Sequence, residues 1–276
     1  MTSMSRAALR PLPDRAFTYW DAQHLLNRAG FGGTPGQIRA LTRMGLNDAV
    51  DYIVDYEEAS PYPVRPDEFD PDIMRPLTDE ERRRLRRARE SGDEAAVEAY
   101  RRERQRRQRA DRQQIRSMQQ WWIRRMIETP RPLEEKLTLF WHGHFATGYR
   151  KIENSYHLFQ QNQLFRHHAT GNFGALCKAI IRDPAMLQYL DNHRNRRGAP
   201  NENLARELLE LFTLGEGNGY TERDIKAGAR ALTGYTFEDD AFVFRPRQHD
   251  SDSKTILGRT GAWDGDDFVD IILRQR

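Results

Sequence analysis

Signals that start and stop helices recur along the chain, and they restrict it to a mainly helical fold. Thr18-x-x-Asp21 and Thr221-x-x-Asp224 have the spacing of capping boxes, in which the two side chains satisfy free amides of a first helical turn. Asp183-Pro184 supplies an N-cap and a first-turn proline. Gly30 follows an apolar-periodic stretch, so we expect it to form a left-handed C-cap.

These signals, combined with apolar periodicity, predict an all-α protein, a multi-helix orthogonal bundle with a small β-hairpin near residues 234–245. We treat residues 1–276 as one helical domain. Within it, residues 59–77 contain five prolines and are expected to form a linker. Residues 78–116 are an Arg/Glu-rich helical excursion from that domain.

The excursion has few large apolar residues and reads as two charged helices joined at Ser91-Gly92-Asp93. A solvated helical surface is the favoured interpretation, because charge runs are usually exposed. An arm that binds an anionic polymer is the alternative, since the arginine excess is local. The net charge of the whole chain is only +3, which gives no support to nucleic acid as a partner.

Composition limits the compartment and the chemistry. No apolar run approaches the roughly 20 residues that a membrane span needs. The segment Met1–Pro11 has arginines but lacks the apolar stretch of a secretory signal, so a cytoplasmic location is the default expectation. Cys177 is the single cysteine and lies in an apolar-periodic segment, where it is expected to be an inert core residue.

The segment Asn201–Gly215 has the densest concentration of polar candidates. Its apolar positions 204, 205, 208, 209, 211 and 212 are expected to form one face. The opposite face carries Asn203, Arg206, Glu207 and Glu210. We expect Glu207 to point inward and to serve as a general base or as a fourth metal ligand, with Asn201, Asn203 and Arg206 binding substrate.

Trp141-His142-Gly143-His144-Phe145 is the sharpest local motif. We expect Gly143 to end a helix, which would let His142 and His144 turn toward one metal ion together with His249 and Asp250. The alternative is that His142 caps helix carbonyls and His144 satisfies a hydrogen bond in the core.

His24 and Arg28 lie four residues apart on a predicted helix. They are candidates for a second catalytic group and for a group that neutralises substrate charge, although an exposed pair is the ordinary interpretation. The sequence lacks Gly-x-Ser-x-Gly, Cys-x-x-Cys, His-Glu-x-x-His and dinucleotide fingerprints. Common hydrolase and zincin mechanisms therefore lose support.

Four segments together resemble the bacterial family known as domain of unknown function 1800: His24 through Gly32, Pro130 through Phe145, Asn201 through Gly215, and Tyr220 through Gly234. The resemblance implies a helical fold and no settled activity. Many members look exported, and their genes often neighbour a family that is similar to sulfatases, which implies a sulfatase-like companion protein. The family typically continues with further helices, so we expect the chain to be C-terminally incomplete relative to it.

Two hypotheses follow, and the first is the leading one. The first is a metal-dependent enzyme, a hydrolase of an anionic or polysaccharide-like substrate with a divalent ion as cofactor. The second is a non-catalytic helical scaffold or binding partner, in which the polar residues form buried networks and helix caps.

Overall fold

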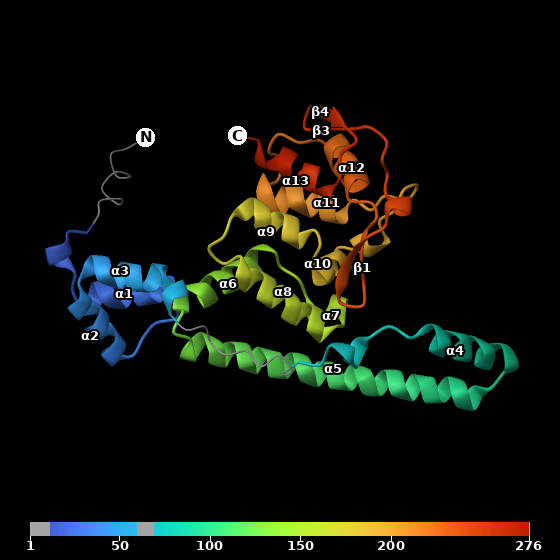
Figure 1. The fold of residues 1–276 in the computed structure, drawn as a ribbon, viewed down its shortest axis with the longest axis horizontal. Coiled ribbons are helices and arrows are strands. Elements are labelled where there is room, and N and C mark those ends of the chain that lie inside the picture. The colour runs from blue at the N-terminus through green and yellow to red at the C-terminus, as the bar shows by residue number, and fades with distance from the viewer. Residues whose placement is uncertain (1–11, 60–68, 276) are drawn as a thin grey trace. The chain divides into compact units, whose positions relative to one another are not determined.

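The computed structural model describes residues 12–59 and 69–275. The predicted linker overlaps the undescribed residues 60–68, and the segment Met1–Pro11 also lies outside the described residues. Within the described part the chain is mainly α-helical, as predicted, with two small antiparallel hairpins (Figure 1). The helices and strands are α1 (Tyr19–Ala29), α2 (Pro35–Met44), α3 (Leu46–Val54), α4 (Asp79–Ser91), α5 (Glu94–Glu128), α6 (Pro132–His144), α7 (Tyr149–Ile152), α8 (Ser155–His167), α9 (Phe173–Ile180), α10 (Pro184–Tyr189), α11 (Asn203–Glu207), α12 (Glu222–Ala231), β1 (Tyr235–Glu238), β2 (Ala241–Phe244), β3 (Lys254–Ile256), β4 (Arg259–Gly261) and α13 (Gly265–Leu273).

The chain divides into two compact units: unit 1 is residues 1–64 and 121–139, and unit 2 is residues 65–120 and 140–276. Unit 1 has its own core between α1, α2 and α3, which includes Leu26, Leu41 and Ile53. The predicted capping box at Thr18 starts α1, and a further capping box at Thr34 starts α2. The prediction for Gly30 was wrong, because its φ is −159° rather than left-handed. Glycine is required there for space, since a Cβ would lie 2.9 Å from Pro132 Cβ.

A buried cluster of charges connects the end of α5 to the start of α6 within unit 1. The Arg125 guanidinium contacts the carboxylate of Glu135 and lies 3.1 Å from that of Glu134. The Trp122 indole donates a hydrogen bond of 2.8 Å to Glu135, and Arg131 lies 3.4 Å from Glu134. Glu135 is 0% exposed. Both glutamates lie in the first turn of α6, where the helix dipole also favours negative charge.

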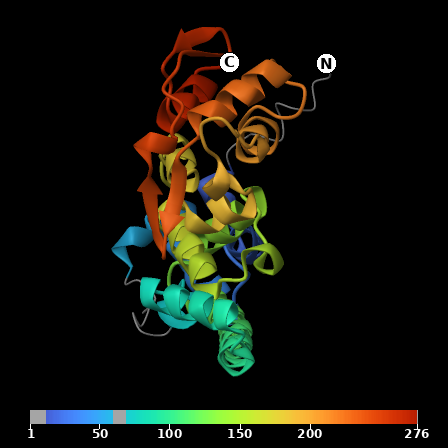
Figure 2. The same cartoon turned by 90° about the vertical axis from the view of Figure 1, so that its right-hand side faces the viewer.

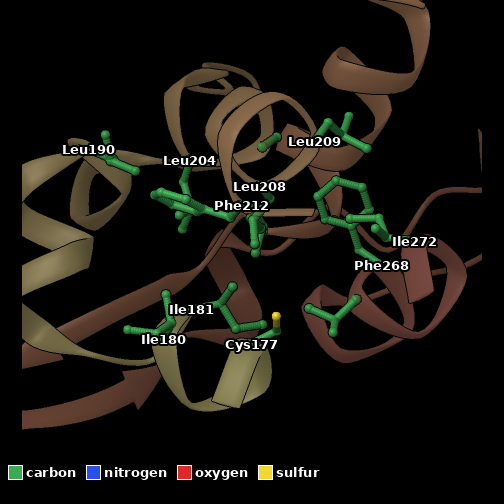
Figure 3. Close-up of a cluster of buried hydrophobic side chains, with 14 of the residues drawn as sticks. Cys177, Ile180, Ile181, Leu190, Leu204, Leu208, Leu209, Phe212, Phe268 and Ile272 are labelled. Carbon is green, nitrogen blue, oxygen red and sulfur yellow. The ribbon is translucent and has the colours of Figure 1, made fainter. Parts of the chain in front are cut away.

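The core of unit 2 is a larger cluster of aliphatic and aromatic side chains (Figure 3). Leu204, Leu208 and Phe212 enter it from α11 and the turn that follows, and Cys177 enters it from α9. Burial raises the pKa of the Cys177 thiol to about 12, so the thiol stays protonated and behaves as a small core residue, as expected. Helices α12 and α13 approach closely at Gly228, where a Cβ would lie 2.4 Å from the Phe268 ring.

Helices α4 and α5 are the two charged helices expected in residues 78–116, and Figure 2 shows α4 crossing close to α5, which is viewed almost end-on. Gly92 ends α4 in the left-handed region, with φ 69°. α5 then continues as a single helix of 35 residues, so the charged segment and the apolar segment after Ile115 belong to the same element. Arg107 donates hydrogen bonds to the carbonyls of Asp72 and Arg75, at 3.1 and 2.7 Å.

The predicted hairpin is formed by β1 and β2, with Tyr235 opposite Phe244. Strands β3 and β4 form a second hairpin that the sequence patterns did not indicate. Among the helices of the described residues, each is too short or too polar to cross a membrane.

Candidate functional site

The segment Asn201–Gly215 does not form one regular helix. α11 ends at Glu207, and residues Leu208–Thr213 (η5) continue it as a π-helical turn. Leu204, Leu208, Leu209 and Phe212 are buried as predicted, but Leu211 is 63% exposed. A π turn holds one more residue than an α turn, so the positions after Leu208 are rotated from an α-helical register. Such turns are frequent at functional sites, which makes this segment the candidate site.

Arg206 is at the centre of an ion-pair cluster on the polar face of α11. Its guanidinium lies 3.2 Å from Glu202, 3.2 Å from Glu210 and 2.8 Å from Glu222. Glu222 and, to a smaller extent, Glu210 raise the pKa of Arg206, and the guanidinium lowers the pKa of Glu222. Arg206 was predicted to bind substrate, and in this structure three carboxylates of the same chain neutralise its positive charge.

Glu207 is partly buried beside this cluster. No described residue forms a hydrogen bond or ion pair with its carboxylate. Burial raises the pKa of Glu207, and the negative charge of Glu210 raises it further, whereas Arg206 lowers it. A carboxyl group with a raised pKa and unused hydrogen-bonding capacity has the properties of a general acid or base.

The predicted substrate-binding asparagines have local structural contacts. Asn201 accepts a hydrogen bond of 3.0 Å from the Asn203 amide, which helps to start α11, and the side chain of Asn203 is exposed. The Asn201 amide donates to the buried side chain of Asn195, at 3.0 Å. Asn195 also donates to Asn192 and to the Ala229 carbonyl, each at 2.9 Å. The sequence did not indicate the buried Asn192 and Asn195, because the segment from 191 to 200 has the composition of a linker.

His142 and His144 contact different parts of unit 2. His142 Nε2 lies 3.1 Å from Asn162 Nδ2, and its ring lies edge-on to Phe165. His144 Nε2 lies 2.9 Å from the Phe212 carbonyl, at the end of η5. The expectation that Gly143 ends the helix was wrong, because α6 continues through it to His144. Two residues separated by one position on a helix point in directions about 160° apart, so the side chains diverge.

His249 and Asp250 are held by the end of α12. His249 Nδ1 lies 2.9 Å from the Thr233 carbonyl. Asp250 forms an ion pair of 2.6 Å with Arg230, which holds the pKa of Asp250 below its ordinary value. Among residues 12–59 and 69–275, no group of three or more His, Cys, Asp or Glu side chains could hold a metal ion. The four predicted ligands therefore are not gathered into one such group, and their assignment to a metal stays a prediction.

His24 and Arg28 are exposed on α1, in unit 1, whereas the other predicted site residues are in unit 2. The α2 N-terminus that follows them is closed by its own capping box, in which the Gln37 side chain accepts the Thr34 amide at 2.8 Å.

The sequence patterns also missed a polar cavity of about 990 Å³ in unit 2. It is lined by side chains of both signs and by Phe237, and the buried His157 lies at its wall. His157 Nε2 lies 3.1 Å from Asp240 Oδ1, whereas its Nδ1 has no hydrogen-bond partner among the described residues. Burial lowers the pKa of His157 and raises that of Asp240. The residues that line this cavity are far apart in the sequence, and no local motif connects them.

Residues 24–276 match the family described as Protein of unknown function (DUF1800). The match covers nearly the whole chain, so the chain belongs to this family, as the four sequence segments indicated. Neither the curated proteins nor the solved structures contain a match to it.

Proposed function

We propose that this chain is a non-catalytic helical binding protein that takes apolar side chains of a partner protein into a hollow of unit 1. The observation that carries the proposal is the hollow itself, which has a volume of about 390 Å³ and a lining that is mainly apolar. Phe31, Met44, Tyr52 and Ile127 line it and remain exposed to solvent. Exposed apolar side chains gathered around a concave surface are typical of protein interaction sites.

The chemistry of the lining fits a protein partner better than a small polar substrate. Met44 and Met126 supply flexible thioethers that adapt to the shape of an inserted side chain. The few polar groups of the lining come mainly from Thr34, Gln37 and Thr129. The partner that the family implies is the sulfatase-like companion protein, and we assign the hollow to it.

Ile127 offers a direct test because it is 75% exposed and lines the hollow. Ile127→Glu should leave folding intact, since exposed substitutions usually change stability by less than about 0.5 kcal/mol. It should weaken binding of the purified companion about 10-fold or more in calorimetry, because a buried isoleucine contributes about 1.5–3 kcal/mol. Ile123→Glu is the matched control, since Ile123 is 58% exposed near the same end of α5 but does not line the hollow. Equal affinity of the Ile127 variant and the native chain would contradict the proposal.

Catalysis is a second candidate function, and Glu207 is the observation that favours it. Its raised pKa and free carboxylate suit proton transfer to or from an anionic or polysaccharide-like substrate. The predicted metal ligands do not enter this candidate mechanism, because each has a separate contact in the structure. Metal analysis of the purified chain before and after chelation tests the predicted metal site independently. Stoichiometric metal in the untreated chain would restore the metal-dependent mechanism.

A further inference from the structure

One face of α5 carries a row of arginines with little compensating negative charge. Arg102, Arg106, Arg109, Arg112 and Arg116 are exposed and recur three or four residues apart, so successive members lie near one another on one side of an α-helix. We call them the arginine row. Arg106 pairs with Glu103 at 2.9 Å. The other four form no ion pair with any residue that the structure describes.

The opposite face of α5 is fixed to the rest of unit 2. Asp111 is buried and accepts hydrogen bonds from the Tyr149 hydroxyl at 2.7 Å and from the Ser155 amide at 2.9 Å. The Gln114 side chain donates a hydrogen bond of 2.9 Å to the Asp70 carbonyl, and Ile115 is buried. The backbone that presents the arginine row is therefore already ordered, which lowers the entropic cost of binding a ligand.

We propose that the arginine row binds a linear acidic polysaccharide, one with sulfate or carboxylate groups along its length. The helical rise places the first and last arginines about 21 Å apart, with successive members separated by about 4.5–6 Å along the axis. A guanidinium can donate two parallel hydrogen bonds to one sulfate or carboxylate group. The unneutralised charges and the extended row thus fit a polymer better than a single small anion.

A polysaccharide fits this face better than a nucleic acid does. Between residues 101 and 120 the sequence contains no Phe, Tyr or Trp. Single-stranded nucleic acids gain much of their affinity by stacking bases on aromatic rings, and the arginine row offers none. Tyr100 precedes the row, but it is half-buried and lines the hollow between α4 and α5.

The test uses the full chain, with heparin as the sulfated probe and with uncharged dextran and single-stranded DNA for comparison. We expect heparin to bind, with affinity that falls about 100-fold between 50 and 200 mM salt if four to five contacts form. Dextran should not bind, and DNA of matched charge should bind more weakly. Replacing Arg102, Arg109, Arg112 and Arg116 together by Gln should weaken heparin binding about 10-fold or more at 50 mM salt.

The control replaces Arg83, Arg86, Arg87 and Arg89 of α4 by Gln, which changes the net charge by the same amount. Glutamine is a good helix former, so circular dichroism should show intact helices in both variants. An equal loss in the control would overturn the proposal, because net charge alone would then explain the binding. Tighter binding of DNA, or no binding of heparin at low salt, would also overturn it. The row lies in unit 2, so these results are independent of the hollow in unit 1.

Discussion

Two arginines of this chain each meet more than one glutamate, but in opposite surroundings. Arg125 of unit 1 is buried and pairs with Glu134 and Glu135, which are buried as well. Arg206 of unit 2 is about one third exposed and pairs with glutamates that water also reaches. The difference shows that the number of ion pairs does not determine what they contribute to stability.

The physical reason is desolvation. A buried charge has lost its hydration, so its partners in the protein must replace the water completely. Around Arg125 they do so through two carboxylates, and Trp122 satisfies a further carboxylate oxygen. Around Arg206 water can replace any lost partner, which makes each pair worth about 1 kcal/mol or less.

The largest effect should come from Glu135→Gln, which keeps the shape of the side chain and removes its charge. Arg125 would lose the negative charge of its fully buried partner Glu135 while it stays buried beside Glu134, so we expect a loss of about 3–5 kcal/mol in the free energy of unfolding. Glu210→Gln, which removes one partner of Arg206, should cost less than about 1 kcal/mol. Urea denaturation of the Glu135 and Glu210 variants is the measurement. Equal losses in the two variants would remove the distinction between the clusters.

A pH-dependent effect of intermediate size should come from Asp183, a buried carboxyl group that hydrogen-bonds to Gln161 and to the Met186 amide, each at less than 3 Å. Burial raises the pKa of Asp183 to about 7, against the hydrogen bonds, which lower it. The unfolded chain releases this proton near pH 4. Between these values the folded state binds more protons, so this group weakens folding as pH rises from about 4 to about 7.

Asp183→Asn removes that dependence and keeps an oxygen that can accept both hydrogen bonds. We expect the variant to gain stability relative to the native chain as pH rises, by at most about 1.4 kcal/mol per pH unit over this range. Thermal unfolding at pH 5, 6 and 7 measures the difference. Asp51→Asn, at an exposed position on α3, is the control. A difference that stays constant with pH would show that Asp183 is ionised throughout.

Local signals were enough to predict much of the fold. The capping boxes at Thr18, Thr34 and Thr221 each involve residues three positions apart, so their chemistry is complete within one turn of helix. The break at Pro130-Arg131-Pro132 follows from the same local rules, and α5 and α6 end and begin beside it. The hairpin β1–β2 likewise depends on neighbouring residues.

The candidate site could be predicted only in part, because its geometry depends on distant contacts. Leu211 is exposed and lies within the π-helical turn Leu208–Thr213, which no apolar spacing reveals. His144 reaches a carbonyl 68 positions away, and His157 contacts Asp240, which lies in the turn between β1 and β2. Glu134 and Glu135 look like ordinary first-turn acids until packing buries them beside Arg125.

The smallest effect on stability should come from Glu207→Gln, because Glu207 has neither the buried partner of Glu135 nor the ion pair of Glu210. Its raised folded pKa means that the native chain loses a little stability as pH rises through that pKa, so at neutral pH the variant should be as stable or slightly more stable. We expect a change within about 0.5 kcal/mol in urea denaturation.

Glu210→Gln should lower the pKa of Glu207 in an NMR titration, since Glu210 contributes to raising it. If Glu207 transfers protons, its variant should lose activity while keeping this stability. A cost near that of Glu135→Gln would instead mean that Glu207 has a buried cationic partner, and it would end the contrast between an isolated carboxyl group and a paired one.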